Sequence, residues 1–394
     1  MGPIYLDYAA TTPTDPRVVE AMQPYWIERF GNPNSLHSWG RKAGYAVEAS
    51  RQTVADALQC STQEVLFASS ATEANNLAIK GSVDSWRRQT PGRTPHIVVS
   101  PIEHHSVLNS VQRLAEDGAI VRWLSVDRFG VIDPAEVEES ITSETVLVSV
   151  GYGNNEVGTI QPIREIAAGI ARRRRGRGFW PLFHTDAVQA IPYLELNVDR
   201  LGVDLLSSSA HKFYGPKGVG FLYVRNGAPV TRQMDGGEQE SHRRAGTENV
   251  PGIVGLAKAL ELARMRATEE RARIEQLRDF FIEGALQVDP RMQLTGHPVN
   301  RLPHIASFVC RGINAEALLA LLDQDGVAAS SGSACTSSSL EPSHVLLAMG
   351  IDPEASHGSL RFSLGRATTR AQLEYAAEVL HRSIETVAAL APTR

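Results

Sequence analysis

One lysine near the middle of the sequence follows a predicted strand. Residues 203–206 form a short apolar run that reads as a buried strand, and Ser209, His211 and Lys212 come soon after it. Open α/β sheets bind their ligands at the carboxyl ends of strands. Lys212 could therefore form a Schiff base with an aldehyde cofactor, while Ser209 and His211 hold an anion beside it. Taken alone, the stretch reads more simply as a polar hairpin with one solvated lysine, because most lysines are exposed.

Polar residues also follow two earlier predicted strands. Ala71 and Thr72 come after the strand at 64–68 and open a helix, whose first N–H groups could bind a phosphate. An ordinary helix cap is the simpler reading of that pair. His104 comes after the strand at 96–100, where an imidazole could stack on a flat ring and transfer protons. A satisfied or solvated histidine is the simpler reading of His104 alone.

Two further strand ends carry an amide and an acid. Asn155 follows the strand at 145–150, and Asp186 and Gln189 follow the strand at 182–185. Asp186 could hold a protonated pyridine nitrogen by a charge-assisted hydrogen bond. Gln189, about one helical turn later, could reach a ring hydroxyl. Each residue alone could be part of a polar loop. Together they place a phosphate seat, a stacking ring, an acid, an amide and a lysine at successive strand ends of one sheet.

A cysteine lies in a stretch of small and polar residues at 329–339. Such a stretch buries little apolar surface, so we expect an exposed, mobile loop. Cys335 on that loop is a candidate nucleophile. The other two cysteines, Cys60 and Cys310, adjoin apolar elements and read as structural residues.

The elements that must position these residues alternate between strands and helices. This alternation predicts an α/β fold with a mostly parallel sheet that is covered on both faces. The helices between strands include residues 73–88 and 107–117. The predicted strands are residues 64–68, 96–100, 119–124, 145–150, 182–185, 203–206 and 219–224.

The remaining elements predict a second, smaller α/β domain. An N-terminal extended segment leads into a helix that starts at Asp15-Pro16 and runs to about residue 30, and residues 38–57 are helical. Residues 261–287 read as one long charged helix that leads to the second domain. That domain contains residues 305–309, 315–323, 358–364 and an amphipathic tail helix at 371–390. We assign residues 15–260 to a large domain, and residues 1–14 and 261–394 to the small one.

Composition excludes several classes of protein. The 394 residues are 42% hydrophobic, enough for a large core, and the net charge of -5 argues against a general nucleic-acid binder. The sequence shows no apolar run of membrane-spanning length and no signal-peptide pattern. None of the three cysteines lies in a Cys-x-x-Cys pair, so we expect neither a metal site nor a disulfide framework. A cytoplasmic location fits best. The arginine run at 172–175 reads as a solvated loop in preference to a docking site for an acidic partner.

These motifs resemble the cysteine desulfurases of the NifS/IscS type, long cysteine-loop group. The matching stretches lie in the family's order and cover nearly the whole chain: residues 5–13, 31–33, 71–73, 103–104, 154–156, 184–189, 209–212, 244–249, 330–336 and 361–364. The resemblance implies the aspartate-aminotransferase fold (fold type I) and the cofactor pyridoxal 5′-phosphate (PLP). It also implies conversion of L-cysteine to L-alanine, with sulfur left on an enzyme cysteine as a persulfide. The destination would be iron–sulfur clusters or another thio-product.

The family's roles transfer to matching positions of this sequence. Lys212 would carry the cofactor and Cys335 the persulfide, and His104 would stack on the ring. Asn155 and Arg361 would bind the substrate carboxylate, the arginine through a bidentate fork. The cofactor would be held by Ala71, Thr72, His104, Asn155, Asp186, Gln189, Ser209, His211, Lys212 and Thr247.

The resemblance also implies partners. Thr247 resembles a residue that reaches the phosphate of the other subunit, which implies a homodimer, and an iron–sulfur scaffold or other acceptor protein would take the sulfur. Ser70 stands where the family often has glycine, which would alter the phosphate turn. Gly151-Tyr152-Gly153 stand where bulkier apolar residues are usual, which would alter the floor of the pocket. A selenocysteine lyase or an aminotransferase on the same fold is the alternative, although an aminotransferase needs no loop cysteine. A non-catalytic binding protein would not need Lys212, Asp186 and Cys335.

Overall fold

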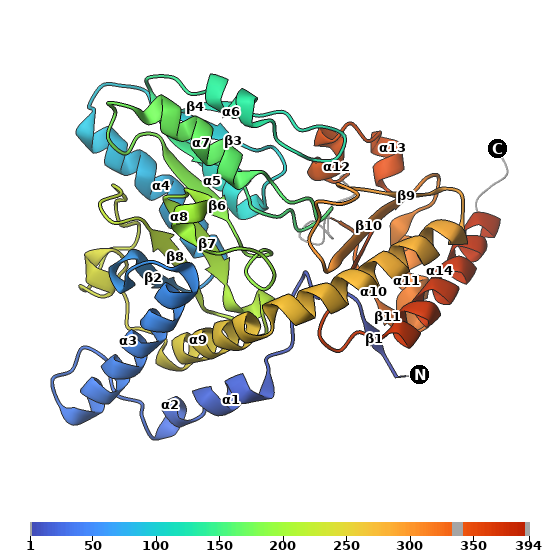
Figure 1. Ribbon diagram of the computed structural model, residues 1–394, viewed down its shortest axis with the longest axis horizontal. Helices are drawn as coiled ribbons and strands as arrows, with labels where there is room; N and C mark the ends of the chain where they lie inside the picture. The colour runs from blue at the N-terminus through green and yellow to red at the C-terminus, as the bar shows by residue number, and fades with distance from the viewer. Residues whose placement is uncertain (1, 333–341, 391–394) are drawn as a thin grey trace.

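The computed structural model describes residues 2–332 and 342–390 of the chain, and a seven-stranded sheet lies at its centre (Figure 1). The strand order is β2-β8-β7-β6-β5-β3-β4. β8 runs antiparallel to β2 and β7, and the other neighbours are parallel. The predicted mostly parallel sheet is therefore confirmed. Its strands are β2 (Val65–Ala68), β3 (His96–Val99), β4 (Ile120–Trp123), β5 (Thr145–Ser149), β6 (Leu182–Asp186), β7 (Leu205–Ser209) and β8 (Gly220–Val224).

Apolar side chains cover both faces of this sheet. In β3, Ile97 and Val99 belong to one buried cluster, and Val98 between them belongs to the other. Alternate residues of a strand point to opposite faces, so helices pack on each side. The helices of this part of the chain are α3 (Ser38–Leu58), α4 (Ala71–Gln89), α5 (His105–Glu116), α6 (Pro134–Glu139), α7 (Ile163–Arg174), α8 (Val198–Leu201) and α9 (Val250–Met265), with short 3-10 helices at Thr62–Glu64, Ala210–Lys212 and Glu240–His242.

The C-terminal part of the chain forms a separate small sheet, on the right of Figure 1. Its order is β12-β10-β9, from β9 (Met292–Leu294), β10 (Ile305–Cys310) and β12 (Ser359–Ser363). The N-terminal strand β1 (Ile4–Tyr5) pairs in parallel with β11 (Val327–Ala328), as expected if the first residues join the small domain. The exact domain boundaries stay a prediction. The helices here are α10 (Ala267–Val288), α11 (Ala315–Gln324), α12 (His344–Ala348), α13 (Pro353–Ser356) and α14 (Arg370–Leu390).

Three predicted elements have different bounds. The first helix is broken into α1 (Pro16–Met22) and α2 (Pro24–Ile27), because Pro24 has no N–H to continue the hydrogen-bond ladder. The long charged helix starts at Ala267, since Arg266 leaves helical geometry with φ -115° and ψ 5°. Strand β7 continues through Ser209, which was predicted to lie in a loop. Pairing with β8 keeps this serine run extended.

The arginine run at the end of α7 is neutralised by nearby acids. Arg172 and Arg173 pair with Glu138, and Arg174 pairs with Asp204. The predicted loop is therefore wrong for Arg172–Arg174, which form the last turn of α7, where these ion pairs hold their side chains. In the described part of the chain, no helix is both long and apolar enough to cross a membrane.

Candidate active site

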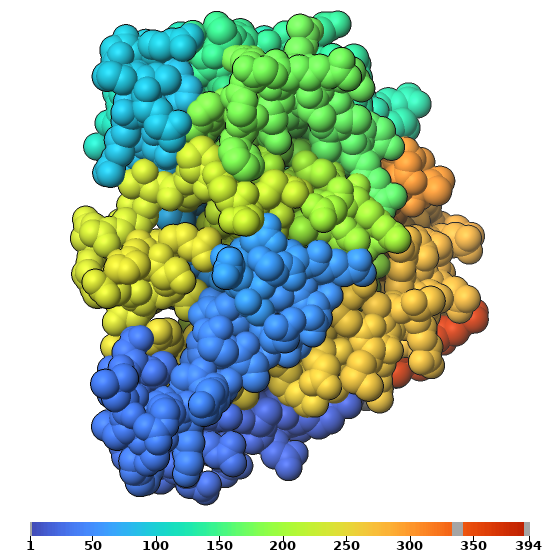
Figure 2. Space-filling view, turned by 60° about the vertical axis from the view of Figure 1, so that its left-hand side comes forward, coloured from blue at the N-terminus to red at the C-terminus, as the bar shows by residue number. Residues whose placement is uncertain are grey.

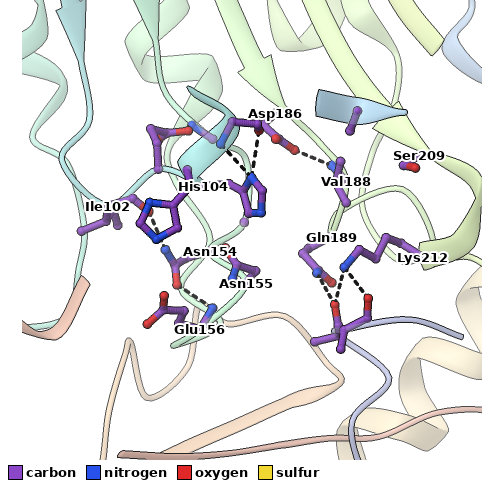
Figure 3. A pocket seen from close by; sticks show the side chains of 18 of the residues that line it. Ile102, His104, Asn154, Asn155, Glu156, Asp186, Val188, Gln189, Ser209 and Lys212 are labelled. Atoms are coloured by element: carbon purple, nitrogen blue, oxygen red, sulfur yellow. Dashed lines mark hydrogen bonds between the residues drawn. The ribbon is translucent and has the colours of Figure 1, made fainter. Parts of the chain in front are cut away.

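A cavity of about 410 Å³ lies at the carboxyl ends of the central strands. Figure 3 shows its polar side chains converging from several elements. Among the residues that line it are ten of the predicted site residues: Ala71, Thr72, His104, Asn155, Asp186, Gln189, Ser209, His211, Lys212 and Arg361. Thr247 is exposed and does not line this cavity. Cys335 lies outside the described residues.

Lys212 is held by the N-terminal segment of the chain. Its Nζ donates to the carbonyl oxygens of Ala9 at 2.7 Å and Ala10 at 2.8 Å, and Figure 3 shows Lys212 and Gln189 pointing to the same short segment. Thr12 then fastens the lysine loop, because its N–H and its hydroxyl both donate to the carbonyl of His211, at 2.9 and 3.0 Å. The amine is thus fixed at the cavity wall by a segment about 200 residues away in sequence.

Asp186, the last residue of β6, is oriented by two donors. Its Oδ1 accepts from the N–H of Val188 at 3.0 Å, and its Oδ2 accepts from Nδ2 of Asn75 at 2.8 Å. Asn75 is fully buried on α4 and also donates to the hydroxyl of Ser106 at 2.8 Å. A carboxylate held this firmly suits a partner of defined geometry, such as a ring N–H.

His104 is the N-cap residue of α5. Its Nδ1 accepts from the N–H of Ser106 at 3.1 Å, so the neutral ring carries its proton on Nε2. Burial lowers the pKa of His104, although the charge of Asp186 opposes this effect. The Ser106 hydroxyl lies 2.8 Å from Nδ1 and links His104 through Asn75 to Asp186. The ring and the acid therefore belong to one hydrogen-bonded unit.

The N-terminus of α4 has the geometry of an anion seat. Ser70 caps the helix by accepting from the N–H of Glu73 at 3.2 Å, so the substituted serine serves as an N-cap. The N–H groups of Ala71 and Thr72 precede the first intrahelical bond and face the cavity end of the helix. A Cβ on Gly220 would lie 2.9 Å from the carbonyl carbon of Ser70, so the glycine permits this close turn. These residues fit a phosphate group.

Two nearby histidines are held neutral. Burial and the neighbouring lysines lower the pKa of His211 to about 4, and its Nδ1 lies 3.1 Å from the hydroxyl of Thr11. Gln189 donates from Nε2 to the carbonyl of Ala9 at 3.0 Å, and its Oε1 lies 3.1 Å from Nε2 of buried His304. Burial lowers the pKa of His304 to about 3. His304 therefore acts as a neutral donor that fixes the amide of Gln189.

Arg361 extends from β12 into the cavity and is 2% exposed. One terminal nitrogen donates to the carbonyl of Asn155 at 2.9 Å, and the other donates to Oδ1 of Asp7 at 2.9 Å. Its Nε is buried and has no hydrogen-bond partner among the described residues. These two bonds fix the orientation of the guanidinium, and its Nε–H remains available to a ligand.

Sequence reasoning missed four residues that build this site. Ser106 gave no distinct signal, and Asp7 and Glu103 were noted only as parts of motifs. Asn75 had one usable signal, because it lies four residues after Ala71 and therefore on the same face of α4. Of the substituted floor residues, Gly151 and Gly153 both line the cavity.

The chain matches the class-V aminotransferase family over residues 4–375. It is 45% identical to the cysteine desulfurase IscS of Dictyoglomus turgidum, across 99% of this chain and 96% of that protein. The chain belongs to the cysteine desulfurases of the class-V aminotransferase family. The IscS of Methanosarcina thermophila is also 45% identical, over 99% of this chain and 94% of that protein.

Solved structures of the family share this fold. A NifS-like protein aligns with a TM-score of 0.90 at 35% identity, covering 98% of this chain and 100% of that chain. SspA in complex with cysteine aligns with a TM-score of 0.77 at 32% identity, covering 92% of this chain and 98% of that one. The expected aspartate-aminotransferase fold and family membership are confirmed.

Proposed function

We propose that this cysteine desulfurase uses Lys212 to hold PLP and Cys335 to take sulfur from L-cysteine, releasing L-alanine. The observation that carries the proposal is the convergence of Lys212, Asp186, His104 and the N-terminus of α4 on one cavity. A lysine, an oriented acid, a neutral imidazole and an anion seat are what a phosphorylated pyridine aldehyde needs. The alternation of strand and helix places all four at one sheet edge.

Different residues of the cavity would bind different parts of the cofactor. PLP, when bound, supplies an aldehyde for a lysine amine and a ring that withdraws electrons. Ala71, Thr72, Ser209 and His211 would hold its phosphate, with Thr247 of a second subunit. Asp186 would keep a proton on the pyridine nitrogen, and His104 would cover the ring face. Gln189 would face the ring hydroxyl, which requires its amide to share or exchange its contact with Ala9.

Arg361 and Asn155 would bind the carboxylate of the substrate. Nε of Arg361, which has no partner among the described residues, and the terminal nitrogen now paired with Asp7 are the donors that a bidentate carboxylate would use. Asp7 would then balance the arginine before substrate enters. L-cysteine would be oriented by this fork, with its amino group toward Lys212.

We assign the role of nucleophile to Cys335, which lies outside the described residues. Gly332 lines the cavity, and three residues of chain span at most about 11 Å. Burial raises the pKa of Cys60 to about 12 and that of Cys310 to about 11, so neither thiol ionises readily at neutral pH. A Cys335 thiolate would bond to the substrate sulfur as the carbon–sulfur bond breaks. The bonding pair would stay on the substrate carbon, which takes up a proton to give alanine.

We also propose that the protein acts as a homodimer in the cytoplasm and passes sulfur to an iron–sulfur scaffold or another acceptor protein. Three cysteines in 394 residues, none of them in a Cys-x-x-Cys pair, fit a reducing compartment. Large apolar side chains are exposed along α1, α2 and the start of α3: Val19, Trp26, Ile27, Phe30, Leu36, Trp39 and Tyr45. Figure 2 shows these blue N-terminal helices beside the yellow segment around residue 240, and Asn34 contacts Glu248 there. A second subunit would cover this apolar face, and Thr247 of each subunit would reach the phosphate site of the other.

Mass spectrometry tests the proposed chemistry. After addition of L-cysteine, the peptide that contains Cys335 should gain sulfur. Cys335→Ser should abolish alanine formation while the visible spectrum of bound PLP still responds to L-cysteine. Cys60→Ser and Cys310→Ser are the matched controls and should keep turnover. Near-normal turnover in Cys335→Ser would refute the assignment of the persulfide. Lys212→Ala should lose the absorbance band of the lysine-bound cofactor. In wild type, borohydride should fix the cofactor on Lys212, and labelling of Lys217 in its place would refute the role of Lys212.

Subunit mixing tests the dimer. Lys212→Ala and Thr247→Ala chains should each be weakly active, and their mixture should regain activity through hybrid dimers with one intact site. A protein that sediments as a fully active monomer would contradict this proposal.

A further inference from the structure

Glu103 places a buried carboxyl group beside the proposed cofactor site. It lies between β3 and α5, is 5% exposed and lines the cavity. The next residue is His104, so a shift in the backbone of Glu103 also shifts the Cα of His104 and the position of its ring. Buried carboxyl groups are rare unless they are hydrogen-bonded, which makes the contacts of this one informative.

The carboxyl group binds the end of a neighbouring strand. Its Oε1 accepts at 2.8 Å from the N–H of Gly151, the second residue after β5. A Cβ on Gly151 would lie 3.0 Å from Oε2 and 3.4 Å from Oε1, so the glycine leaves the carboxyl its room. The substitution of Gly151 in the cavity floor is thus matched to Glu103.

The backbone of Glu103 binds a third element. Its carbonyl oxygen accepts from Nε2 of His344 at 3.0 Å. His344 is the first residue of α12, and its ring centroid lies 4.9 Å from that of His105. Glu103 therefore connects the end of β5, the start of α5 and the start of α12.

We propose that Glu103 is a positioning residue that fixes the His104 ring relative to the sheet edge and to α12. This inference rests on the proposed function, because it concerns the ring that would cover PLP. Glu103 acts through His104 and Gly151, and no role in binding substrate is assigned to it. Glu103 is suited to this task because its carboxyl group bonds the loop after β5 while its carbonyl oxygen bonds the first residue of α12.

The protonation state of Glu103 follows from its surroundings. Burial raises the pKa of Glu103 to about 8, and the charge of Asp186 raises it further, against the hydrogen bond from Gly151. A protonated Glu103 adds no second negative charge beside Asp186. The other titratable groups that line the same cavity are His104 and His105 on α5, Glu156 after β5, His211 and Lys212 after β7, and His344 on α12, with Arg361 as a fixed charge.

Amide substitution separates position from charge. In Glu103→Gln, the amide oxygen can still accept from Gly151, and the amide is isosteric with the protonated acid. We expect kcat within about threefold of wild type at pH 7 and unchanged visible circular dichroism of bound PLP. Wild-type kcat should fall as the pH rises through about 8, because Glu103 ionises there, and Glu103→Gln should lack this fall.

Truncation should release the ring. Glu103→Ala is expected to lower kcat about 100-fold, the scale of a 1 Å misplacement, and to change the visible circular dichroism. Gly151→Ala, which displaces the carboxyl without removing it, should shift both readouts in the same direction and serves if Glu103→Ala does not fold. Glu116→Gln, at the far end of α5 with a half-exposed side chain, is the control and should leave both readouts unchanged.

Three outcomes would overturn the inference. They are a folded Glu103→Ala with wild-type dichroism and kcat, a Glu103→Gln as impaired as Glu103→Ala at pH 7, and the same alkaline fall in Glu103→Gln as in wild type. Failure of the proposed function would look different, because wild type itself would then form no persulfide. The dichroism of bound PLP is read without turnover, so it separates the two failures.

Discussion

The ion pair between Asp7 and Arg361 allows a prediction in which stability and substrate binding change in opposite directions. The Arg361 side chain is 2% exposed and the Asp7 side chain 20% exposed, with 2.9 Å between Nη2 and Oδ1. Within the part of the chain that the structure describes, Asp7→Ala leaves a buried guanidinium whose Nε has no partner and one of whose terminal nitrogens has lost its partner. The protein should lose stability, while the donors meant for a substrate carboxylate become more available.

The magnitude follows from burial. Breaking a fully buried ion pair costs about 3–5 kcal/mol, but solvent reaches part of Asp7, so we expect about 2–3 kcal/mol for Asp7→Ala. Asp7→Asn keeps an acceptor oxygen and loses only the charge, so about 1–2 kcal/mol is expected. Glu374→Ala breaks the exposed pair with Arg370 on α14 and should cost less than about 0.5 kcal/mol, which makes it the control.

Urea unfolding with and without L-alanine measures both effects. Asp7→Ala should unfold at lower urea than wild type, and L-alanine should stabilise it more than it stabilises wild type, since the ligand carboxylate replaces the lost partner. The KM for L-cysteine should fall. Wild-type stability together with an unchanged KM would refute the reasoning that Asp7 balances Arg361.

Two further predictions concern packing and acid. Gly220→Ala puts a Cβ against the carbonyl oxygen of Ser208, so we expect about 1–3 kcal/mol of destabilisation and faster PLP loss on dialysis. Gly284→Ala on α10, where the added Cβ meets no atom within 4 Å, is the control and should keep wild-type stability and PLP retention. Acid should destabilise the fold, because burial lowers the pKa of His184 to about 4 and that of His304 to about 3 from 6.5. Between the unfolded pKa of 6.5 and these folded values, the unfolded chain binds more protons than the folded one. The free energy of unfolding therefore falls as the pH drops below about 6.5, by about 2 kcal/mol per histidine at pH 5. Urea midpoints from pH 7.5 to 5 measure this slope, and a flat profile would contradict the buried neutral state.

Local sequence predicted most of the central sheet and the residues at its edge. Short apolar runs gave the strands, and parallel pairing then requires their carboxyl ends to meet. His104 and Asp186 could therefore be placed in one cavity without knowing any contact between them. A helix with clear periodicity was also predictable, as α14 shows.

Contacts that depend on tertiary structure could not be predicted. Nothing near Asp7 indicates a partner 354 residues away, and nothing near Ala9 indicates that its carbonyl holds Lys212. The buried serines of β7 read as a loop because their hydroxyls are polar, yet Ser207 lies 3.0 Å from Nε2 of His184. Such residues satisfy each other across strands, and single-sequence patterns do not show this.

The contacts of the N-terminal segment set an order of events during synthesis. Asp7 leaves the ribosome first, and Arg361 follows 354 residues later. At about 5–20 residues per second, that delay is roughly 20–70 s. Throughout this interval Ala9, Ala10 and Thr12 can meet the Lys212 loop only after its own strands have emerged, and Asp7 can pair with Arg361 only after that residue has also emerged. A nascent chain should therefore form the sheet edge early and make the contact between Asp7 and Arg361 later. The N-terminal segment then completes the site after the sheet has formed.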